Sequence, residues 1–190
     1  MRTRRRIAIA QGAAVGALAY ALSMVQIPFP LVPYLIFDLG EIPVAAVMLA
    51  GSPLSSLVAA GVYFGVMNLI GQFVPIGPAL KLAAVLSMLA GLYPFSRRGP
   101  VSGASFAGAF ALSTAIRVVV MTALNFAVVE ALFPGFLGIA ADAAMRYVHI
   151  AMSPLELVLL LTAAFNAIQS AISLIPAAAA ARALRAAGLP

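Results

Sequence analysis

The sequence predicts an all-α integral membrane protein with six transmembrane helices and both termini in the cytoplasm, and three observations lead to this fold class. Of the 190 residues, 64% are hydrophobic and only 8% are charged, whereas a soluble domain carries about 25% charged residues. The mean hydropathy is +1.12. Apolar runs close to the length that crosses a bilayer core, about 20 residues, recur along the chain. A water-soluble fold is excluded because so few charges would leave most of its surface apolar.

The apolar runs are bounded by charge, proline or glycine and form one domain over residues 1–190. They are 7–27, 38–52, 54–74, 78–95, 104–132 and 154–184. After the first run, prolines stiffen a loop over 28–37. The second run begins at Asp38 and Glu41, which have the spacing of a capping box, in which side chains hydrogen-bond to free backbone amides. We expect both acids to cap this short helix, which Gly51-Ser52-Pro53 turns into the third.

The later helices are separated by residues that interrupt helices or stay outside the membrane. Two prolines and a glycine in 75–78 end the third helix and precede the fourth. Arg97 and Arg98 lie in a polar turn between the fourth and fifth helices. A longer loop, 133–153, precedes the sixth and contains the only histidine, His149. We expect His149 to be a loop residue rather than a ligand contact, although a role in a lid stays open.

The arginines predict the orientation, because positively charged loops stay in the cytoplasm. Those next to helix ends all fall on one side of a six-helix chain: Arg2, Arg4, Arg5, Arg6, Arg97, Arg98, Arg182 and Arg185. The net charge of +6 therefore reflects arginines on the cytoplasmic side of a multi-pass plasma-membrane protein. It does not indicate nucleic-acid binding. The N-terminal run, ending in Ala19-Tyr20-Ala21, also imitates a secretory signal, but its length favours a membrane span.

Polar side chains inside the predicted helices indicate a ligand pocket. They are Asn68, Gln72, Lys81, Arg117, Asn125, Glu130, Glu156, Asn166, Gln169 and Ser170. Arg117, Met121 and Asn125 share one helical face. Most of these groups lie in the outer half of four helices, which favours a pocket open to the outside for a polar small molecule. One alternative is that the amides hydrogen-bond between helices and only stabilise their packing. Another is that Lys81 forms an ion pair with Glu130 or Glu156. For Arg117 we expect a structural partner.

The first helix carries small residues at intervals of four. The rows are Ala10 and Ala14, then Ala13, Ala17 and Ala21, then Gly12 and Gly16. Such rows let another helix approach closely. Packing within the molecule and docking to a partner protein both remain open on this pattern.

Several function classes are disfavoured. The chain has no cysteine and a single histidine, so an intramembrane Ser-His pair or a histidine metal site is improbable. We therefore predict no enzyme, no cofactor and no metal site. The chain also lacks a phosphate-binding loop, so any ATP hydrolysis must occur on another subunit. A self-sufficient channel or carrier stays as an alternative, although the inverted repeats typical of such proteins are not evident.

Four short motifs, in order along the chain, resemble the substrate-binding S components of energy-coupling factor (ECF) vitamin transporters, above all the riboflavin-specific kind. They are Phe37-Asp38-Leu39-Gly40-Glu41-Ile42-Pro43, Asn68-Leu69, Met121-Thr122-Ala123-Leu124-Asn125 and Phe165-Asn166-Ala167-Ile168. The resemblance implies an importer subunit that binds riboflavin from outside. It also implies docking, through the alanine rows, on a membrane T component driven by two cytosolic ATPases.

The resemblance also implies site residues. Asn68, Asn125 and Asn166 are the expected substrate contacts. Asp38 and Glu41 are included because they belong to the first motif. Lys81 is added only because its predicted depth in the membrane is similar to that of the other polar groups. This chain departs from the riboflavin pattern where members commonly carry lysine, at Ile36, Met67 and Gln169, and Glu41 replaces the usual second aspartate. Thiamine, cobalamin or another ring-bearing vitamin is therefore the alternative substrate.

Overall fold

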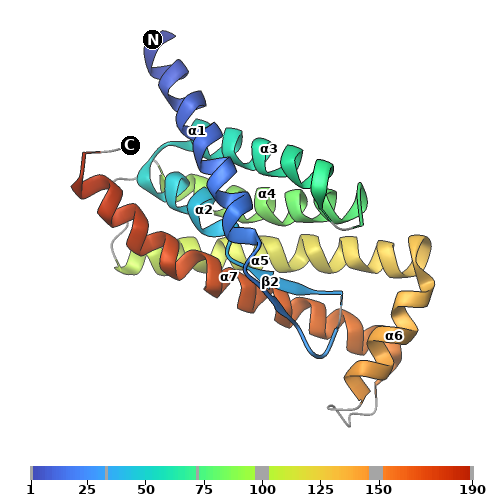
Figure 1. Cartoon of the computed structure of the whole chain (residues 1–190). Coiled ribbons are helices and arrows are strands. Elements are labelled where there is room, and N and C mark those ends of the chain that lie inside the picture. Colours follow the sequence, from blue (N-terminus) through green and yellow to red (C-terminus); the bar gives the residue numbers. More distant parts are fainter. Residues whose placement is uncertain (1, 33, 72, 97–102, 146–151, 189–190) are drawn as a thin grey trace.

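The computed structural model describes residues 2–32, 34–71, 73–96, 103–145 and 152–188, and is built of helices with one short β-hairpin (Figure 1). The elements are α1 (Arg2–Ser23), β1 (Gln26–Pro28), β2 (Ile36–Asp38), α2 (Glu41–Ala50), α3 (Pro53–Ile70), α4 (Ile76–Ser96), α5 (Gly103–Ala127), the π-helical η1 (Val128–Leu132), α6 (Pro134–Met145) and α7 (Pro154–Ala186). Gln72, Arg97, Arg98 and His149 lie outside the described residues, so the expectations for them stay predictions.

Within the described ranges, five helices are long and apolar enough to cross a membrane. They are Thr3–Ser23, Pro53–Ile70, Ile76–Ser96, Gly103–Leu132 and Pro154–Ala186. This confirms the predicted helical fold, and the length and composition of these helices suggest a multi-pass membrane protein. Four of the predicted runs match to within about four residues at each end, since hydropathy and the flanking prolines define them locally.

The predicted second span, 38–52, is a half-length helix. Its 10 residues extend about 15 Å at 1.5 Å per residue, against about 30 Å for a hydrocarbon core. Apart from Ile42, every side chain of α2 is buried, because α2 is surrounded by α1, α3, α4 and α7. The helix ends at Gly51, whose φ of 102° is left-handed and suits glycine. α2 is thus the core of the bundle rather than a lipid-facing element.

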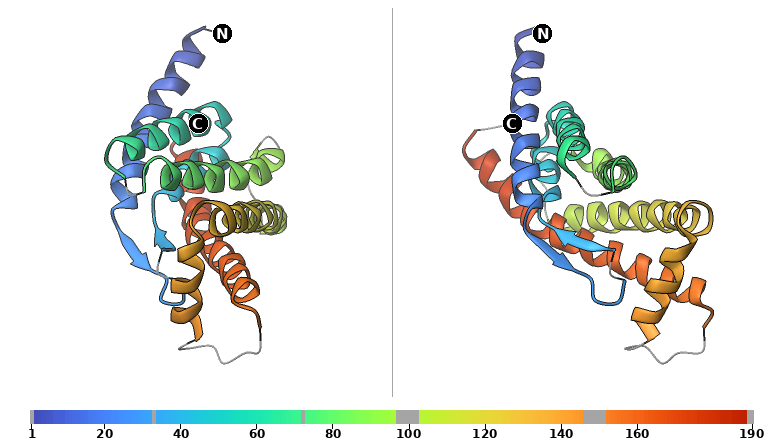
Figure 2. Two further views of the ribbon diagram at one scale, coloured as in Figure 1. Left: turned by 90° about the vertical axis from the view of Figure 1, so that its right-hand side faces the viewer. Right: turned by 45° about the vertical axis from the view of Figure 1, so that its right-hand side comes forward.

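The prediction of helix up to residue 27 was wrong, because the chain leaves α1 at Ser23 and forms a hairpin. In this hairpin β1 pairs antiparallel with β2, and Gln26 lies opposite Asp38. Its aromatic residues Phe29 and Phe37 pack with Phe165 of α7 in a small hydrophobic cluster. Figure 2 shows the hairpin alongside α7. The hairpin therefore brings Asp38 against the helical bundle.

Glycines set the contact between α1 and α3. A Cβ atom on Gly12 would lie 2.6 Å from the carbonyl oxygen of Ser55, and one on Gly16 would lie 2.8 Å from that of Ala59. Because neither distance is tolerable for a real Cβ atom, any larger residue would force the two helices apart. The glycine row of the first helix thus serves packing within the molecule.

The predicted outer loop 133–153 contains a helix that the sequence prediction missed. α6 follows η1 and packs against η1 and α7. Its composition, rich in alanine after an initial proline, favours a helix. Figure 1 places α6 at the opposite end of the molecule from the start of α1 and the end of α7.

Candidate ligand-binding site

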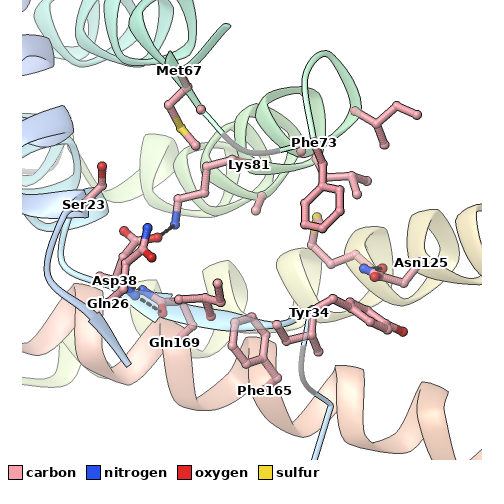
Figure 3. Close-up of a pocket in the computed structure, with 18 of the residues that line it drawn as sticks. Ser23, Gln26, Tyr34, Asp38, Met67, Phe73, Lys81, Asn125, Phe165 and Gln169 are labelled. Atoms are coloured by element: carbon pink, nitrogen blue, oxygen red, sulfur yellow. Dashed lines mark hydrogen bonds and ion pairs between the residues drawn. The ribbon is translucent and has the colours of Figure 1, made fainter. Parts of the chain in front are cut away.

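A cavity of about 490 Å³ opens among the hairpin and the ends of several helices (Figure 3). Its lining comes from α1, the hairpin, α3, α4, α5 and α7. The volume lies within the range of roughly 300–1,000 Å³ that is usual for small-molecule sites. Figure 3 shows Lys81, Phe73 and Asn125 arranged around it.

A cluster of four charged residues lies at one wall of the cavity. The Lys81 ammonium donates to Asp38 Oδ2 at 2.6 Å and to Glu41 Oε1 at 2.7 Å. Arg117 donates from Nη2 to Glu41 Oε1 at 3.0 Å, and from Nη1 to Glu41 Oε2. The expected structural partner of Arg117 is therefore Glu41. The suggested pairing of Lys81 with Glu130 or Glu156 was wrong, since the Lys81 ammonium forms ion pairs with Asp38 and Glu41 instead.

Glu41 lies behind the cavity wall rather than on it. Its side chain is fully buried, it does not line the cavity, and it accepts a further bond from Ser173 Oγ at 2.9 Å. A buried carboxylate needs such a shell of donors, because an unpaired charge in the interior is very costly. Glu41 thus positions Lys81 and Arg117 instead of contacting the cavity.

The capping box predicted between Asp38 and Glu41 was wrong, although Asp38 does bind a backbone amide just before α2. The N-cap of α2 is Gly40, which has no side chain to cap the helix, and Asp38 Oδ1 accepts from the Gly40 backbone amide at 2.8 Å. The Glu41 carboxylate is used in the charged cluster. A capping box does occur at the start of α7, between Ser153 and Glu156.

Gln169 of α7 fixes the end of the hairpin. Its Nε2 donates to the Asp38 carbonyl oxygen at 2.8 Å, and its Oε1 accepts from the Asp38 backbone amide at 3.3 Å. Nε2 also donates to Ser173 Oγ at 3.0 Å, and Ser173 in turn donates to Glu41. This chain of bonds connects the backbone of β2 to the charged cluster.

The three predicted asparagines have different environments. Asn125 and Asn166 line the cavity, whereas Asn68 does not, and its Nδ2 donates to the Phe64 carbonyl oxygen within α3. Asn166 Oδ1 accepts from Arg117 Nε at 3.0 Å, so this amide supports the cluster. Asn125 Nδ2 donates to the Met121 carbonyl oxygen at 2.8 Å, which leaves its Oδ1 without a partner among the described residues. Asn125 is therefore the asparagine best placed to bind a ligand.

The fifth helix confirms the predicted stripe. Arg117, Met121 and Asn125 are all buried and line the cavity, as the four-residue spacing indicated. The same row extends toward the helix start through Ser113, against which Gly91 of α4 packs closely.

Aromatic side chains form another part of the wall. The rings of Phe37 and Phe165 are stacked, with centroids 4.5 Å apart and planes at 19°, and Phe165 lines the cavity with Tyr34, Phe73 and Phe133. Burial raises the pKa of Tyr34 to about 12, so its phenol is neutral at physiological pH. These rings were not predicted as site residues. Phe37 and Phe165 each begin one of the quoted motifs and precede a polar residue in it, which was the available signal.

The alanines of α1 lie mainly on its outer surface. Ala10, Ala14, Ala17 and Ala21 are exposed and Ala13 is half-buried. The four exposed alanines fall within about 60° of arc at 100° per residue. The alanine face is therefore separate from the glycine row that contacts α3.

Among the described residues, no three His, Cys, Asp or Glu side chains gather as they would to hold a metal ion. Comparison of the chain with known protein families, curated proteins and solved structures found no match.

Proposed function

We propose that this chain is the substrate-binding S component of an ECF-type vitamin importer, with riboflavin as its ligand. The observation that supports this proposal best is the cavity itself, which combines an aromatic wall with a few polar groups inside a membrane-type helical bundle. Such sites suit planar ring compounds with polar edges. Phe165 would pack against the ring, and Asn125 Oδ1 would accept a hydrogen bond from it.

The departures from the riboflavin pattern support the same location. Ile36, Met67 and Gln169, where the resemblance implies lysine, all line the cavity. The only lysine of the chain, Lys81, lines it too, from α4. The differences from the family pattern thus lie in the ligand site. Such differences are expected there if this chain binds the ligand in another orientation or binds another vitamin.

The proposed topology has six passes, with both termini cytoplasmic in the plasma membrane. In this arrangement β2 and α2 together make the second pass, since α2 alone is too short. The start of α1 and the end of α7 lie at the opposite end of the molecule from α6, which supports this topology (Figure 1). The ligand then enters from the outside.

Transport in this proposal requires partners. The exposed alanines of α1 would dock on a membrane T component, because small side chains let a second helix approach closely. Two cytosolic ATPases would supply energy, and release would follow from reorientation of this chain in the bilayer. Few charges on the lipid-facing surface favour such movement, since charged groups are costly in hydrocarbon.

The ligand retained through purification tests this function. The protein would be purified in mild detergent without added vitamin, denatured, and the released small molecules identified by mass and absorbance. Riboflavin in near-stoichiometric amount supports the full proposal. Thiamine or cobalamin would keep the S-component assignment and refute riboflavin. If no vitamin is retained, and none added at micromolar concentration binds, the S-component proposal fails and the self-sufficient carrier becomes the leading alternative.

A further inference from the structure

The charged groups at the cavity balance one another. Lys81 and Arg117 contribute two positive charges, and Asp38 and Glu41 contribute two negative charges, all joined by the ion pairs above. The remaining acids that the structure describes, Glu130, Asp142 and Glu156, are exposed and do not line the cavity. The charged residues of the described wall, taken together with Glu41 directly behind it, therefore have a formal charge of zero.

We propose that this charge-balanced wall selects an uncharged ligand, and that Glu41 is a positioning residue that enforces the selection without touching the ligand. This inference rests on the proposed function in one respect, that the cavity binds a small molecule.

The geometry explains why a charged ligand is disfavoured. Glu41 holds Arg117 through both carboxylate oxygens and holds Lys81 as well, and Asp38 holds Lys81 from the cavity side. A ligand anion would have to compete with these carboxylates for the cations, and a ligand cation would have to compete with the cations for the carboxylates. Either would also lose its own hydration on entering a largely apolar cavity.

A neutral polar ligand meets no such cost. Lys81 carries three N–H donors and uses two of them on Asp38 and Glu41, so one donor is available to a ligand carbonyl or ring nitrogen. Asn125 offers an acceptor from the opposite side. The wall thus provides hydrogen bonds of both kinds without a net charge.

Matched pairs of vitamins that differ mainly in charge test this inference. The pairs are riboflavin with riboflavin 5′-phosphate, pyridoxine with pyridoxine 5′-phosphate and nicotinamide with nicotinate, and thiamine is added as a cation. Binding to the detergent-purified chain would be measured by calorimetry at low salt. We expect the tightest ligand to be uncharged, and its charged counterpart to bind at least about tenfold more weakly.

The outcomes separate this inference from the proposed function. If an uncharged vitamin other than riboflavin binds best, the riboflavin assignment fails and charge selection stands. If a charged member binds best, charge selection is overturned while the S-component proposal stands. If neither a member of the panel nor cobalamin binds, both are overturned.

Two variants make the test specific to the wall. Asp38→Asn leaves one excess positive charge, so the preference for the uncharged member over its anionic partner should shrink by about tenfold. Lys81→Met leaves one excess negative charge, so the same preference should grow and thiamine should gain affinity. Both side chains are slightly exposed, 12% for Asp38 and 14% for Lys81, and are safer to change than Glu41.

The readout is the ratio of two affinities, which general structural damage would not shift in opposite directions. Asp142→Asn is the matched control, because it removes the same charge from the exposed surface of α6, and its ratio should equal that of the unmodified chain. An unchanged ratio in both Asp38→Asn and Lys81→Met would overturn the proposal.

Discussion

The side-chain amide of Gln169 pairs with both backbone groups of Asp38, donating at 2.8 Å and accepting at 3.3 Å. The two residues are 131 positions apart, so this pair connects the N-terminal hairpin to the last helix at the edge of the cavity. It holds the Asp38 carboxylate where Lys81 can reach it.

Gln169→Leu should weaken both folding and ligand binding. The variant loses three hydrogen bonds, two to Asp38 and one to Ser173. Each contributes about 1 kcal/mol, so we expect a loss of about 3 kcal/mol in stability and weaker binding of the ligand as Asp38 loses its support. Thermal unfolding in detergent and a binding titration measure the two effects. Ile168→Ala, at a neighbouring position that is 46% exposed, is the control and should leave binding unchanged. Normal affinity in Gln169→Leu would show that the hairpin does not depend on this pair.

Arg117→Leu should be strongly destabilising, whereas the double variant Glu41→Leu/Arg117→Leu should recover much of the loss. Removing one member of a buried ion pair typically costs 3–5 kcal/mol, while replacing both by apolar residues is often nearly neutral. The double variant leaves Lys81 paired with Asp38. Thermal stability in detergent distinguishes the cases, and a double variant no more stable than Arg117→Leu would contradict this description of the cluster.

Local patterns in the sequence were enough to predict the long helices and the buried stripe on α5. A run of apolar residues bounded by proline, glycine or arginine defines each helix, and Arg117, Met121 and Asn125 share a face because of their spacing alone. These inferences needed only neighbours within a few turns.

The charged cluster needed information that one sequence does not contain. The partners of Glu41 lie 40, 76 and 132 positions away, whereas the capping-box prediction used only the three-residue spacing from Asp38. The local pattern therefore favoured a cap, but in the structure the Glu41 carboxylate forms tertiary ion pairs instead. The hairpin was missed for the same reason, since β1 after Ser23 continues an apolar run and is defined by its pairing with β2.

The two small-residue rows of α1 should respond differently to substitution. Gly16→Leu should destabilise the protein, because its side chain would meet Val62 and the Ala59 carbonyl oxygen of α3. Ala14→Leu and Ala17→Leu change exposed positions and should leave stability and ligand binding intact but abolish uptake with the T component and ATPases. Uptake of labelled vitamin in cells and binding in detergent separate these effects. Unimpaired uptake in the Ala14→Leu/Ala17→Leu double variant would refute the docking role of this face.

Lys81 should be protected from amine reagents by the bound ligand. It is the only lysine in the chain, so its modification is resolved by mass spectrometry of a single peptide, with the N-terminal amine as an internal reference. We expect slow labelling, because the ammonium is paired with Asp38 and Glu41, and slower labelling still when ligand is present. Asp38→Asn should label faster. Labelling unaffected by a saturating ligand would place the ligand away from Lys81.

A riboflavin titration of the purified chain tests the central claim, that this cavity binds riboflavin, most directly. Riboflavin fluorescence would be followed as protein is added, with Asn125→Leu as the cavity variant and Asp142→Asn as the surface control. The account predicts quenching that saturates at one riboflavin per chain with submicromolar affinity, at least about tenfold weaker in Asn125→Leu and unchanged in Asp142→Asn. No quenching at micromolar riboflavin, or equal affinity in Asn125→Leu, would contradict it.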